Sequence, residues 1–287
     1  MKLVRFGSPG AERPGLWMED RGAPEILDVR AMAYDIADYD QHFFTHWGLD
    51  RLRGLLLEKN QKRISATGVR LGPPTPTPTN LICVGKNYAE HAAEFDSQIP
   101  TEPILFAKSP TSLIGPNDSI TIPAEFGEVD AEAELAVVIG IHAHRVTEAE
   151  ALSHIAGYTL MNDVTERRAQ REAGQWFRGK SFDTFAPIGP CLVTADEFGN
   201  PQDQPIQSRL NGNVLQDGNT RDMLFSVARI ISYISATLTL QPGDIIATGT
   251  PPGVGFARTP PLFLRSGDAI EIHSPRIGSL SNPIIRA

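Results

Sequence analysis

One segment, residues 129–140, constrains the fold of this chain more than any other, because acidic and apolar residues alternate and then give way to a wholly apolar run. If this segment is a β-strand, its side chains point alternately to two faces. One face is then continuously apolar and belongs in a core. The other face begins with Asp130, Glu132 and Glu134 and continues with small apolar residues. The pattern predicts a strand whose far half is buried on both sides and whose beginning is crowded with carboxylates.

Like charges at one end of a strand repel each other, so solvent, a raised pKa or a cation must offset the repulsion. A set of oxygen ligands suits Mg²⁺ or Ca²⁺ better than zinc or copper. For Glu132 and Glu134 alone, an acidic and solvated strand end is the simpler interpretation. Asp163 follows the apolar run that starts at Gly157 and is a third candidate, but an Asp at a strand end often bonds its own turn. Spacing alone does not decide between these interpretations.

A histidine and a carboxylate in residues 85–94 form a second candidate group. On a helix, His91 and Glu94 lie three positions apart and face each other. A carboxylate that orients an imidazole makes it a better general base toward water. An ordinary surface His–Glu pair on a short helix would have the same spacing, so both interpretations stay open.

Lys180 lies among aromatic residues in the segment 175–185. It can stabilise an oxyanion, or it can simply pair with Asp183. The surrounding Gly-Lys-Ser is not a phosphate loop, because the upstream glycine and the strand-to-helix context are missing. The Gly/Pro-rich turn 248–255 can line a site with its backbone groups, although a plain tight turn explains it equally well.

A proline-rich stretch, residues 72–79, divides the chain, because repeated prolines remove backbone donors and favour an extended conformation. We expect a small N-terminal module, residues 1–72, with one helix around 49–57, and a larger domain, residues 80–287. Gly and Pro together make 48 of 287 residues (25 and 23), which favours turns and short strands over a helix bundle. The predicted class is α+β with strands predominating.

Local signals within the larger domain predict two helices, a hairpin and a further strand. The spacing of Thr147 and Glu150 is that of a capping box, and Gly157 is placed to end the helix that follows. A second helix is expected to begin near Asp222, with apolar residues at steps of three and four. Asn211-Gly212 predicts a tight hairpin, and residues 244–248 predict a strand.

The charge balance excludes several classes of partner. There are 34 acidic and 26 basic residues, which gives a formal charge of −8 with no long basic block. Binding to nucleic acid or to anionic lipid needs clustered Lys and Arg, so neither is expected. No export signal or membrane-spanning run is visible in the sequence. The two cysteines, Cys83 and Cys191, provide neither a disulfide framework nor a zinc cluster, which favours a reducing, cytoplasmic setting.

In their order along the chain, these segments resemble the fumarylacetoacetate hydrolase family over about residues 80–285. The residues that carry the likeness are Gly85-Lys86-Asn87-Tyr88 with His91 and Glu94, Asp130 with Glu132 and Glu134 before the apolar run 135–140, Asn162-Asp163 with Arg167 and Gln170, Gly179-Lys180-Ser181 with Asp183, and Thr248-Gly249-Thr250-Pro251. Within the family, three further segments look most like hydrolases of 2,4-diketo-3-deoxy sugar acids, namely residues 70–74, 165–167 and 216–220.

The resemblance implies a mixed β-roll catalytic domain, a homodimer and a divalent metal ion, Mg²⁺ with Mn²⁺ or Ca²⁺ as alternatives. The reaction it implies is hydrolysis of a carbon–carbon bond in a 2,4-diketo acid, a small oxo-acid substrate, to pyruvate and a second acid. The implied metal ligands are Glu132, Glu134 and Asp163. His91, oriented by Glu94, would activate water, and Lys180 would stabilise negative charge. The implied substrate contacts are Arg167, Gln170 and Thr250.

Two departures from the family pattern affect the pocket rather than the ligands. Ala131 stands where many members have an aromatic residue, and Arg168 stands where many have Asp.

Two alternative functions stay open beside hydrolysis. The same metal-enolate chemistry serves oxaloacetate decarboxylation and the isomerisation of a hydroxymuconate-like diacid. A metal-stabilised binding module without catalysis is the alternative from another class.

Overall fold

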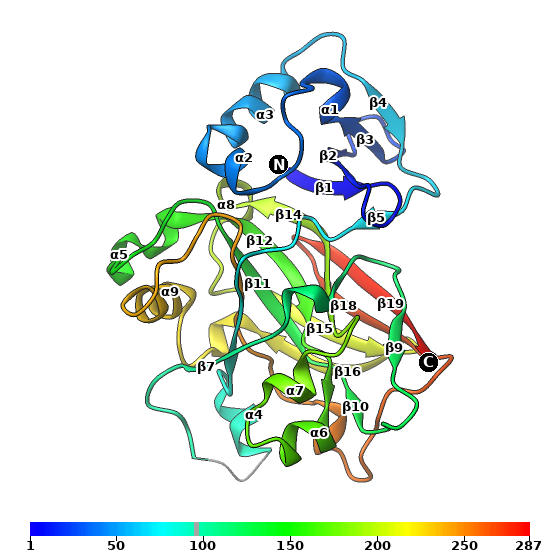
Figure 1. Cartoon of the computed structure of the whole chain (residues 1–287), viewed down its shortest axis with the longest axis vertical. Coiled ribbons are helices and arrows are strands. Elements are labelled where there is room, and N and C mark those ends of the chain that lie inside the picture. The colour runs from blue at the N-terminus through cyan, green and yellow to red at the C-terminus, as the bar shows by residue number, and fades with distance from the viewer. Residues whose placement is uncertain (95–97) are drawn as a thin grey trace.

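The computed structural model describes residues 1–94 and 98–287, and β-sheets make up most of its architecture (Figure 1). The largest sheet has twelve strands, with the order β4-β3-β2-β1-β14-β12-β11-β17-β6-β7, while β5 pairs with β1 and β8 pairs with β14. A five-stranded sheet has the order β16-β15-β18-β19-β9, and β10 and β13 form a separate pair. Parallel pairs such as β17 with β6 occur among antiparallel ones. The predicted α+β class with strands predominating is confirmed.

The strands of the N-terminal half are β1 (Lys2–Phe6), β2 (Arg13–Met18), β3 (Glu25–Asp28), β4 (Arg63–Ser65), β5 (Leu71–Gly72), β6 (Leu81–Gly85), β7 (Ile104–Ala107), β8 (Leu113–Ile114), β9 (Ile120–Ile122), β10 (Val129–Asp130) and β11 (Ala133–Ile139). The remaining strands are β12 (Ile155–Asn162), β13 (Thr165–Glu166), β14 (Ala186–Thr194), β15 (Pro205–Leu210), β16 (Asn213–Asn219), β17 (Ile245–Ala247), β18 (Ala269–Ser274) and β19 (Gly278–Arg286).

The helices are short and lie at the edges of the sheets (Figure 1). They are α1 (Val29–Met32), α2 (Gln41–Thr45), α3 (Gly48–Leu56), α4 (Ala89–Ala93), α5 (Glu148–Ala151), α6 (Arg167–Glu172), α7 (Phe177–Lys180), α8 (Ala195–Phe198) and α9 (Val227–Ser235), with 3₁₀ turns at Pro110–Ser112, Leu152–His154, Thr220–Asp222 and Gly255–Ala257. Within the described ranges, no helix is long and apolar enough to cross a membrane.

The segment predicted as one strand is interrupted. Residues Val129–Asp130 form β10 and pair with β13, whereas Ala133–Ile139 form β11 and pair with β12 and β17. Ala131 and Glu132 lie between the two strands, because the chain changes partner there. The predicted alternation still holds, since the apolar face from Val129 to Ile139 lies in one core cluster with residues of the five-stranded sheet. The far half of β11 is buried as the sequence predicted, and its acidic beginning, including Glu134, is buried as well.

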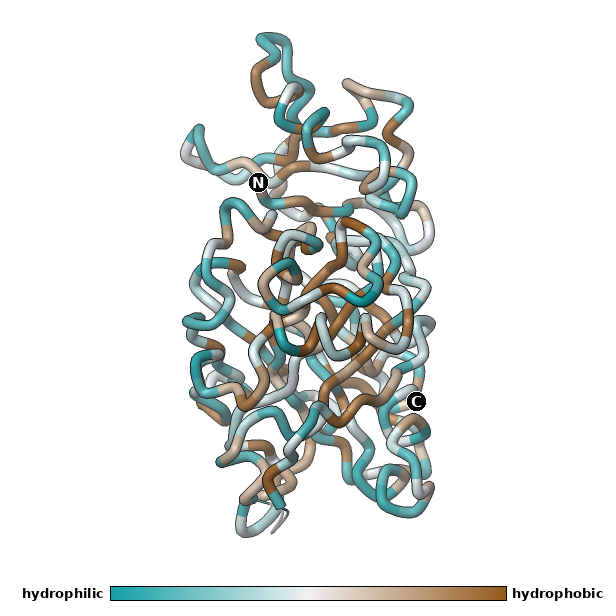
Figure 2. The backbone as a smooth tube through the Cα atoms, turned by 90° about the vertical axis from the view of Figure 1, so that its left-hand side faces the viewer, coloured by the Kyte–Doolittle hydropathy of each residue, from teal (hydrophilic) through white to brown (hydrophobic). Residues whose placement is uncertain are grey.

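The N-terminal residues extend the main sheet. Strand β1 pairs with β14 in register Lys2↔Val193 and Leu3↔Leu192, so β1 to β4 continue the sheet that carries the site. Helices α1 to α3 and this end of the sheet lie at the top of Figure 1. The buried apolar residues of these three helices belong to a second core cluster that also contains residues of β1, β2, β3, β11, β12 and β14. In Figure 2 hydrophobic segments run through the middle of the molecule and continue into this end. The predicted helix around 49–57 is confirmed as α3.

Gly157 does not end a helix, contrary to the sequence prediction. The capping box of Thr147 and Glu150 is present, but α5 stops at Ala151 and a 3₁₀ turn leads into β12, where Gly157 pairs with Thr194. A Cβ atom at position 157 would lie 2.3 Å from the carbonyl oxygen of Val193. The glycine therefore permits the close approach of β12 and β14.

The second predicted helix begins five residues later than expected. Asp222 lies in a 3₁₀ turn, and α9 starts at Val227 because the Ser226 side chain caps it by accepting a hydrogen bond from the backbone N–H of Arg229. The predicted hairpin at Asn211-Gly212 joins β15 and β16, and the predicted strand is β17.

Candidate metal centre and active site

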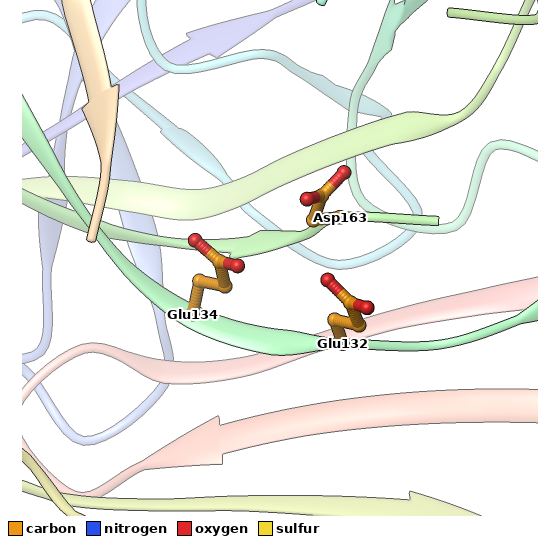
Figure 3. Close-up of side chains that lie close together, drawn as sticks. All are labelled: Glu132, Glu134 and Asp163. Carbon is orange, nitrogen blue, oxygen red and sulfur yellow. The ribbon is translucent and has the colours of Figure 1, made fainter. Parts of the chain in front are cut away.

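Three carboxylates converge where β11 begins and β12 ends. Glu132 immediately precedes β11, Glu134 lies on it, and Asp163 follows β12. Ladder pairing of β11 with β12 brings these positions together, and the amide N–H of Asp163 donates to the carbonyl of Glu132 at 2.9 Å. One oxygen from each of the three carboxylates lies within 4.8 Å of the others, and all three residues are buried. Figure 3 shows the three side chains directed toward a common space.

The three carboxylates differ in their partners. Lys180 Nζ donates to Glu132 Oε2 at 2.7 Å and to Asp163 Oδ2 at 2.6 Å. Burial opposes ionisation of Glu132, but Lys180 and Arg167 hold its pKa well below the ordinary value. Glu134 Oε2 accepts a hydrogen bond from the Gly249 backbone N–H. Burial and the charges of Asp163 and Glu132 raise the pKa of Glu134 well above the ordinary value.

This donor set fits a divalent cation with a preference for hard oxygen ligands. The buried charged side chains of the centre are four carboxylates, those of Asp130, Glu132, Glu134 and Asp163, against three cations, those of Lys108, Lys180 and Arg167. With all of these groups ionised the sum is one negative charge, and burial together with the charges of Asp163 and Glu132 raises the pKa of Glu134. A cation bound by Glu132, Glu134 and Asp163 would relieve it. Carboxylate oxygens are the ligands that Mg²⁺, Mn²⁺ and Ca²⁺ accept.

The His91–Glu94 pair forms as the spacing predicts. Helix α4 carries His91 and ends at Ala93, with Glu94 as its C-terminal cap. His91 Nδ1 and Glu94 Oε2 are 2.8 Å apart, and Glu94 Oε1 accepts a hydrogen bond from the Gly253 N–H at 2.7 Å. Both oxygens of Glu94 are therefore engaged. Because a carboxylate accepts hydrogen bonds, its contact with Nδ1 favours the tautomer of His91 that has a proton on Nδ1. His91 lines the same cavity as Glu132 and Glu134, so its imidazole lies beside the carboxylates of the candidate metal centre.

Lys180 does not form the pair with Asp183 that the sequence left open. It contacts Glu132 and Asp163 instead, with its ammonium 5.1 Å from the centre of the Phe106 ring. Burial alone would lower the pKa of Lys180, but the two carboxylates outweigh burial and raise it. The two carboxylates therefore favour the charged form of Lys180, whose ammonium donates a hydrogen bond to each of them.

Arg167, Gln170 and Thr250 all line the cavity. Arg167 Nη2 lies 2.7 Å from both Asp130 Oδ2 and Glu132 Oε1, and Nη1 donates to Gln170 at 3.3 Å. The Thr250 hydroxyl donates to the carbonyl of Ala133 at 2.9 Å and accepts from Gln216 at 2.7 Å. Its proton is thus committed to the backbone, so the hydroxyl of Thr250 cannot donate to a substrate in this arrangement.

One cavity of about 220 Å³ joins these groups. Its polar end contains the carboxylates, His91, Arg167 and Lys180, and aromatic rings form much of its wall. The lining residues are Val84, Gly85, Lys86, His91, Phe106, Glu132, Glu134, Arg167, Gln170, Arg171, Trp176, Lys180, Thr250 and Phe256. The cavity therefore offers a charged end for an anionic group and an apolar wall for the rest of a small molecule.

Sequence reasoning gave no role in the site to Lys108 or Gln216, and it named Asp130 only as one of the alternating carboxylates. Lys108 is buried against Asp163, and Gln216 fixes Thr250. Asp130 accepts hydrogen bonds from Arg167 and from the backbone N–H groups of Ala131, Gly255 and Phe256. A lysine directly after an apolar strand was the available signal for Lys108. Gln216 lies in the segment 216–220 that carries part of the resemblance, but no local pattern gave it a role in the site.

Replacing Asp130 with alanine is expected to destabilise the protein by about 3–5 kcal/mol, because Arg167 would remain buried without its main partner. The loop at Gly255 would also lose its two contacts to the carboxylate. Denaturant unfolding of metal-free protein measures the change. Asp203→Ala is the control, since this exposed aspartate pairs only with other surface residues in the described contacts. Equal stability of the Asp130 variant and the control would contradict the assigned role.

Replacing Gly85 with alanine is expected to displace Trp176, because a Cβ atom there would lie 2.4 Å from its ring. The wall of the cavity would move while the carboxylates stay in place. We expect kcat/KM to fall roughly ten- to hundredfold and the affinity for metal to stay unchanged. Gly54→Ala is the control, since a Cβ atom at that helix position meets nothing within 4 Å. Unchanged kcat/KM in the Gly85 variant would show that Trp176 does not shape the substrate site.

Comparison with known proteins agrees with this fold and site. Residues 80–285 match the family model described as fumarylacetoacetate (FAA) hydrolase C-terminal. An oxaloacetate tautomerase of Xenopus laevis, described as mitochondrial, is 39% identical over 290 residues, covering 99% of this chain and 90% of the relative. The family model spans more than half of the chain, and the relative covers nearly all of it. The chain belongs to the fumarylacetoacetate hydrolase family.

Two solved structures show the range of reactions among its relatives. A fumarylacetoacetate hydrolase from the psychrophile Exiguobacterium antarcticum has a TM-score of 0.85 and 38% identity, with complete coverage of both chains. A 5-carboxymethyl-2-hydroxymuconate delta-isomerase from Mycobacterium smegmatis has a TM-score of 0.79 and 34% identity, covering 100% of this chain and 99% of that one. The fold predicted from the resemblance is therefore confirmed, and the reaction is not fixed by family membership.

Proposed function

We propose that the protein is a divalent-metal-dependent hydrolase that cleaves a carbon–carbon bond in a 2,4-diketo acid to give pyruvate and a second acid. A 2,4-diketo-3-deoxy sugar acid is one such acylpyruvate-type substrate. The observation that carries the proposal is the convergence on one cavity of three buried carboxylates, the His91–Glu94 pair and the ammonium of Lys180. Each group matches a requirement of this reaction.

Glu132, Glu134 and Asp163 would hold the metal ion at the charged end of the cavity. A divalent ion there supplies a Lewis acid, which stabilises the enolate of pyruvate that the reaction releases. Lys180 would add a positive charge beside the same carboxylates. Arg167 and Gln170 would orient the carboxylate and the oxo group of the substrate. Thr250, whose hydroxyl donates to the carbonyl of Ala133, would contribute to substrate binding through the backbone groups of its turn.

His91 would take a proton from water, with Glu94 stabilising the imidazolium that forms. The oxygen of that water forms a bond to C4 of the substrate, at the distal carbonyl. When the bond between C3 and C4 breaks, its electron pair passes to the three-carbon fragment as the enolate of pyruvate. His91 then returns the proton to C3 of this fragment. The products are pyruvate and the carboxylic acid formed from C4.

Oxaloacetate decarboxylation, tautomerisation or hydroxymuconate-type isomerisation is the second candidate, because these reactions also pass through a stabilised enolate. The names of the Xenopus and Mycobacterium relatives favour it. None of these reactions requires attack by water. The His91–Glu94 pair favours hydrolysis, since it provides a base beside the carboxylate cluster. A binding module without catalysis is a further alternative, which the proton-transfer groups argue against.

Two further proposals, on the metal ion and on the oligomer and its substrate, rest on the family resemblance, and a third, on the compartment, rests on the cysteines. The native ion is Mg²⁺, with Mn²⁺ or Ca²⁺ as substitutes of similar ligand preference. The protein is a homodimer that acts on a small oxo acid. It works in the cytoplasm, where its two buried cysteines, Cys83 and Cys191, stay reduced.

A metal-replete screen tests the proposed function. The panel contains acylpyruvates, 2,4-diketo-3-deoxy sugar acids, oxaloacetate and hydroxymuconate-type diacids, with pyruvate, carbon dioxide and ultraviolet absorbance as readouts. Hydrolysis predicts pyruvate and a second acid in equal amounts from a diketo acid. Turnover of oxaloacetate or of the muconates alone would favour the second candidate, and no turnover of any compound would favour a binding module.

A further inference from the structure

Lys108 is a buried cation that none of the proposed steps uses. It immediately follows β7, and its side chain is 0% exposed. Its Nζ donates to Asp163 Oδ1 at 2.6 Å and to the carbonyl of Val164 at 3.1 Å. It is absent from the cavity lining, so a substrate would not touch it. Any influence of Lys108 on the reaction must therefore act through Asp163.

Asp163 is held from both sides. Its Oδ1 accepts from Lys108 and its Oδ2 accepts from Lys180, each at 2.6 Å. Lys180 faces the cavity and Lys108 lies behind the carboxylate. One cation would be enough to satisfy a single carboxylate, and a second buried ammonium is costly to desolvate. The second lysine therefore needs an explanation beyond the stability of Asp163.

The charge balance of the centre provides this explanation. The four buried carboxylates and three buried cations leave one negative charge. A divalent ion would change the total to one positive charge, which attracts the carboxylate of an oxo acid and the enolate that forms from it. Without Lys108 the same loaded centre would be neutral. Attraction between the metal ion and its three ligands would then increase, because a nearby positive charge has gone.

We propose that Lys108 sets the charge of the metal centre. Its positive charge lowers the affinity of the centre for the metal ion and raises the affinity of the metal-loaded centre for an anionic substrate. Lys108 acts as a positioning and charge-setting residue through Asp163 and is not itself a catalytic residue. The inference rests on the proposed function, since it presumes a divalent ion at Glu132, Glu134 and Asp163. It predicts that loss of the charge changes two affinities in opposite directions, which loss of packing alone would not do.

Two neutral variants test this inference. Lys108→Gln keeps a hydrogen-bond donor near Asp163, and Lys108→Met fills the space without one. The first measurement is the dissociation constant of Mn²⁺ for metal-free protein, followed by electron paramagnetic resonance. The second is the dissociation constant of oxalate for the Mn²⁺-saturated protein, by calorimetry, because oxalate copies the planar dianionic enolate of pyruvate. We expect Mn²⁺ to bind about fivefold or more tightly and oxalate about tenfold or more weakly in both variants.

Arg178→Gln is the matched control, because it removes a positive charge from an exposed side chain two residues from Lys180. Solvent screens that charge, so both constants should stay within about twofold of wild type. Weaker or unchanged Mn²⁺ binding in the Lys108 variants would overturn the inference, as would unchanged oxalate binding. Loss of the folded state in both variants would assign Lys108 to folding alone and would also overturn it. Failure of the wild-type protein to bind Mn²⁺ would instead refute the proposed metal site.

Discussion

Replacing His91 with alanine is expected to lower pyruvate release from a 2,4-diketo acid by about 10³-fold, with little change in metal affinity. The ring lines the cavity beside the carboxylates, and its Nδ1 is fixed by Glu94, so it is the base placed to activate water. Steady-state kinetics of pyruvate formation at saturating Mg²⁺ measure the loss. Glu94→Gln should give a smaller fall, because the imidazole remains but loses the charge that stabilises its protonated form.

His46→Ala is the control for this experiment, since His46 is an exposed residue directly after α2 and outside the cavity. It should retain the wild-type rate. The same His91 variant also separates the two candidate functions. Formation of an enolate from oxaloacetate does not need attack by water, so decarboxylation or tautomerisation of oxaloacetate does not require His91 as a base toward water. Release of pyruvate from a 2,4-diketo acid by the variant at the wild-type rate would exclude His91 as the hydrolytic base.

Replacing Glu134 with glutamine is expected to abolish specific binding of Mn²⁺ and to lower activity below detection. The substitution removes one of three carboxylate ligands and keeps the size of the side chain. It should also stabilise the metal-free protein, because burial and two neighbouring carboxylates oppose ionisation of Glu134. Thermal unfolding with and without Mg²⁺ measures both effects. The wild-type protein should gain melting temperature with Mg²⁺, and the variant should gain none.

The pH dependence of the metal-free protein follows from the same group. The pKa of Glu134 in the folded state is raised above the ordinary value of 4.5. The contribution of Glu134 to the stability of the folded protein is therefore fully present below pH 4.5, and it is lost as the pH rises through the pKa of Glu134 in the folded state. The metal-free wild type should lose melting temperature as the pH rises, and Glu134→Gln should lose less. Glu172→Gln, a change at an exposed residue of α6, should behave as wild type. Identical pH profiles for all three proteins would contradict this assignment.

Alternation of side chains was sufficient to predict the part of the fold that carries the site. The apolar face from Val129 to Ile139 forms a core, and the carboxylates that alternate with it gather at one end. The break at Ala131 and Glu132 was not predictable, because it depends on β10 pairing with β13, which lies more than 30 residues further along the chain. Local pattern fixes which face a residue takes, whereas strand partners depend on distant sequence.

Gly157 and Lys108 show two further limits of local reasoning. Gly157 follows a short helix and has the spacing of a helix end, yet it is needed because β14 approaches it closely. Lys108 lies 55 residues from Asp163, so no spacing rule connects them. The His91–Glu94 pair was predictable because its contact is local to one helical turn. Lys180 was found by its aromatic surroundings, but its carboxylate partners lie beside two strands, Glu132 just before β11 and Asp163 just after β12.

The dependence of pyruvate release on a divalent ion tests the central claim most directly. The protein is dialysed against a chelator and assayed with its fastest diketo-acid substrate, before and after Mg²⁺ is restored. We expect a loss of at least about 10³-fold in kcat without metal and full recovery with Mg²⁺, because the enolate loses its Lewis acid. Equal rates of pyruvate release by metal-free and metal-replete protein would contradict the account.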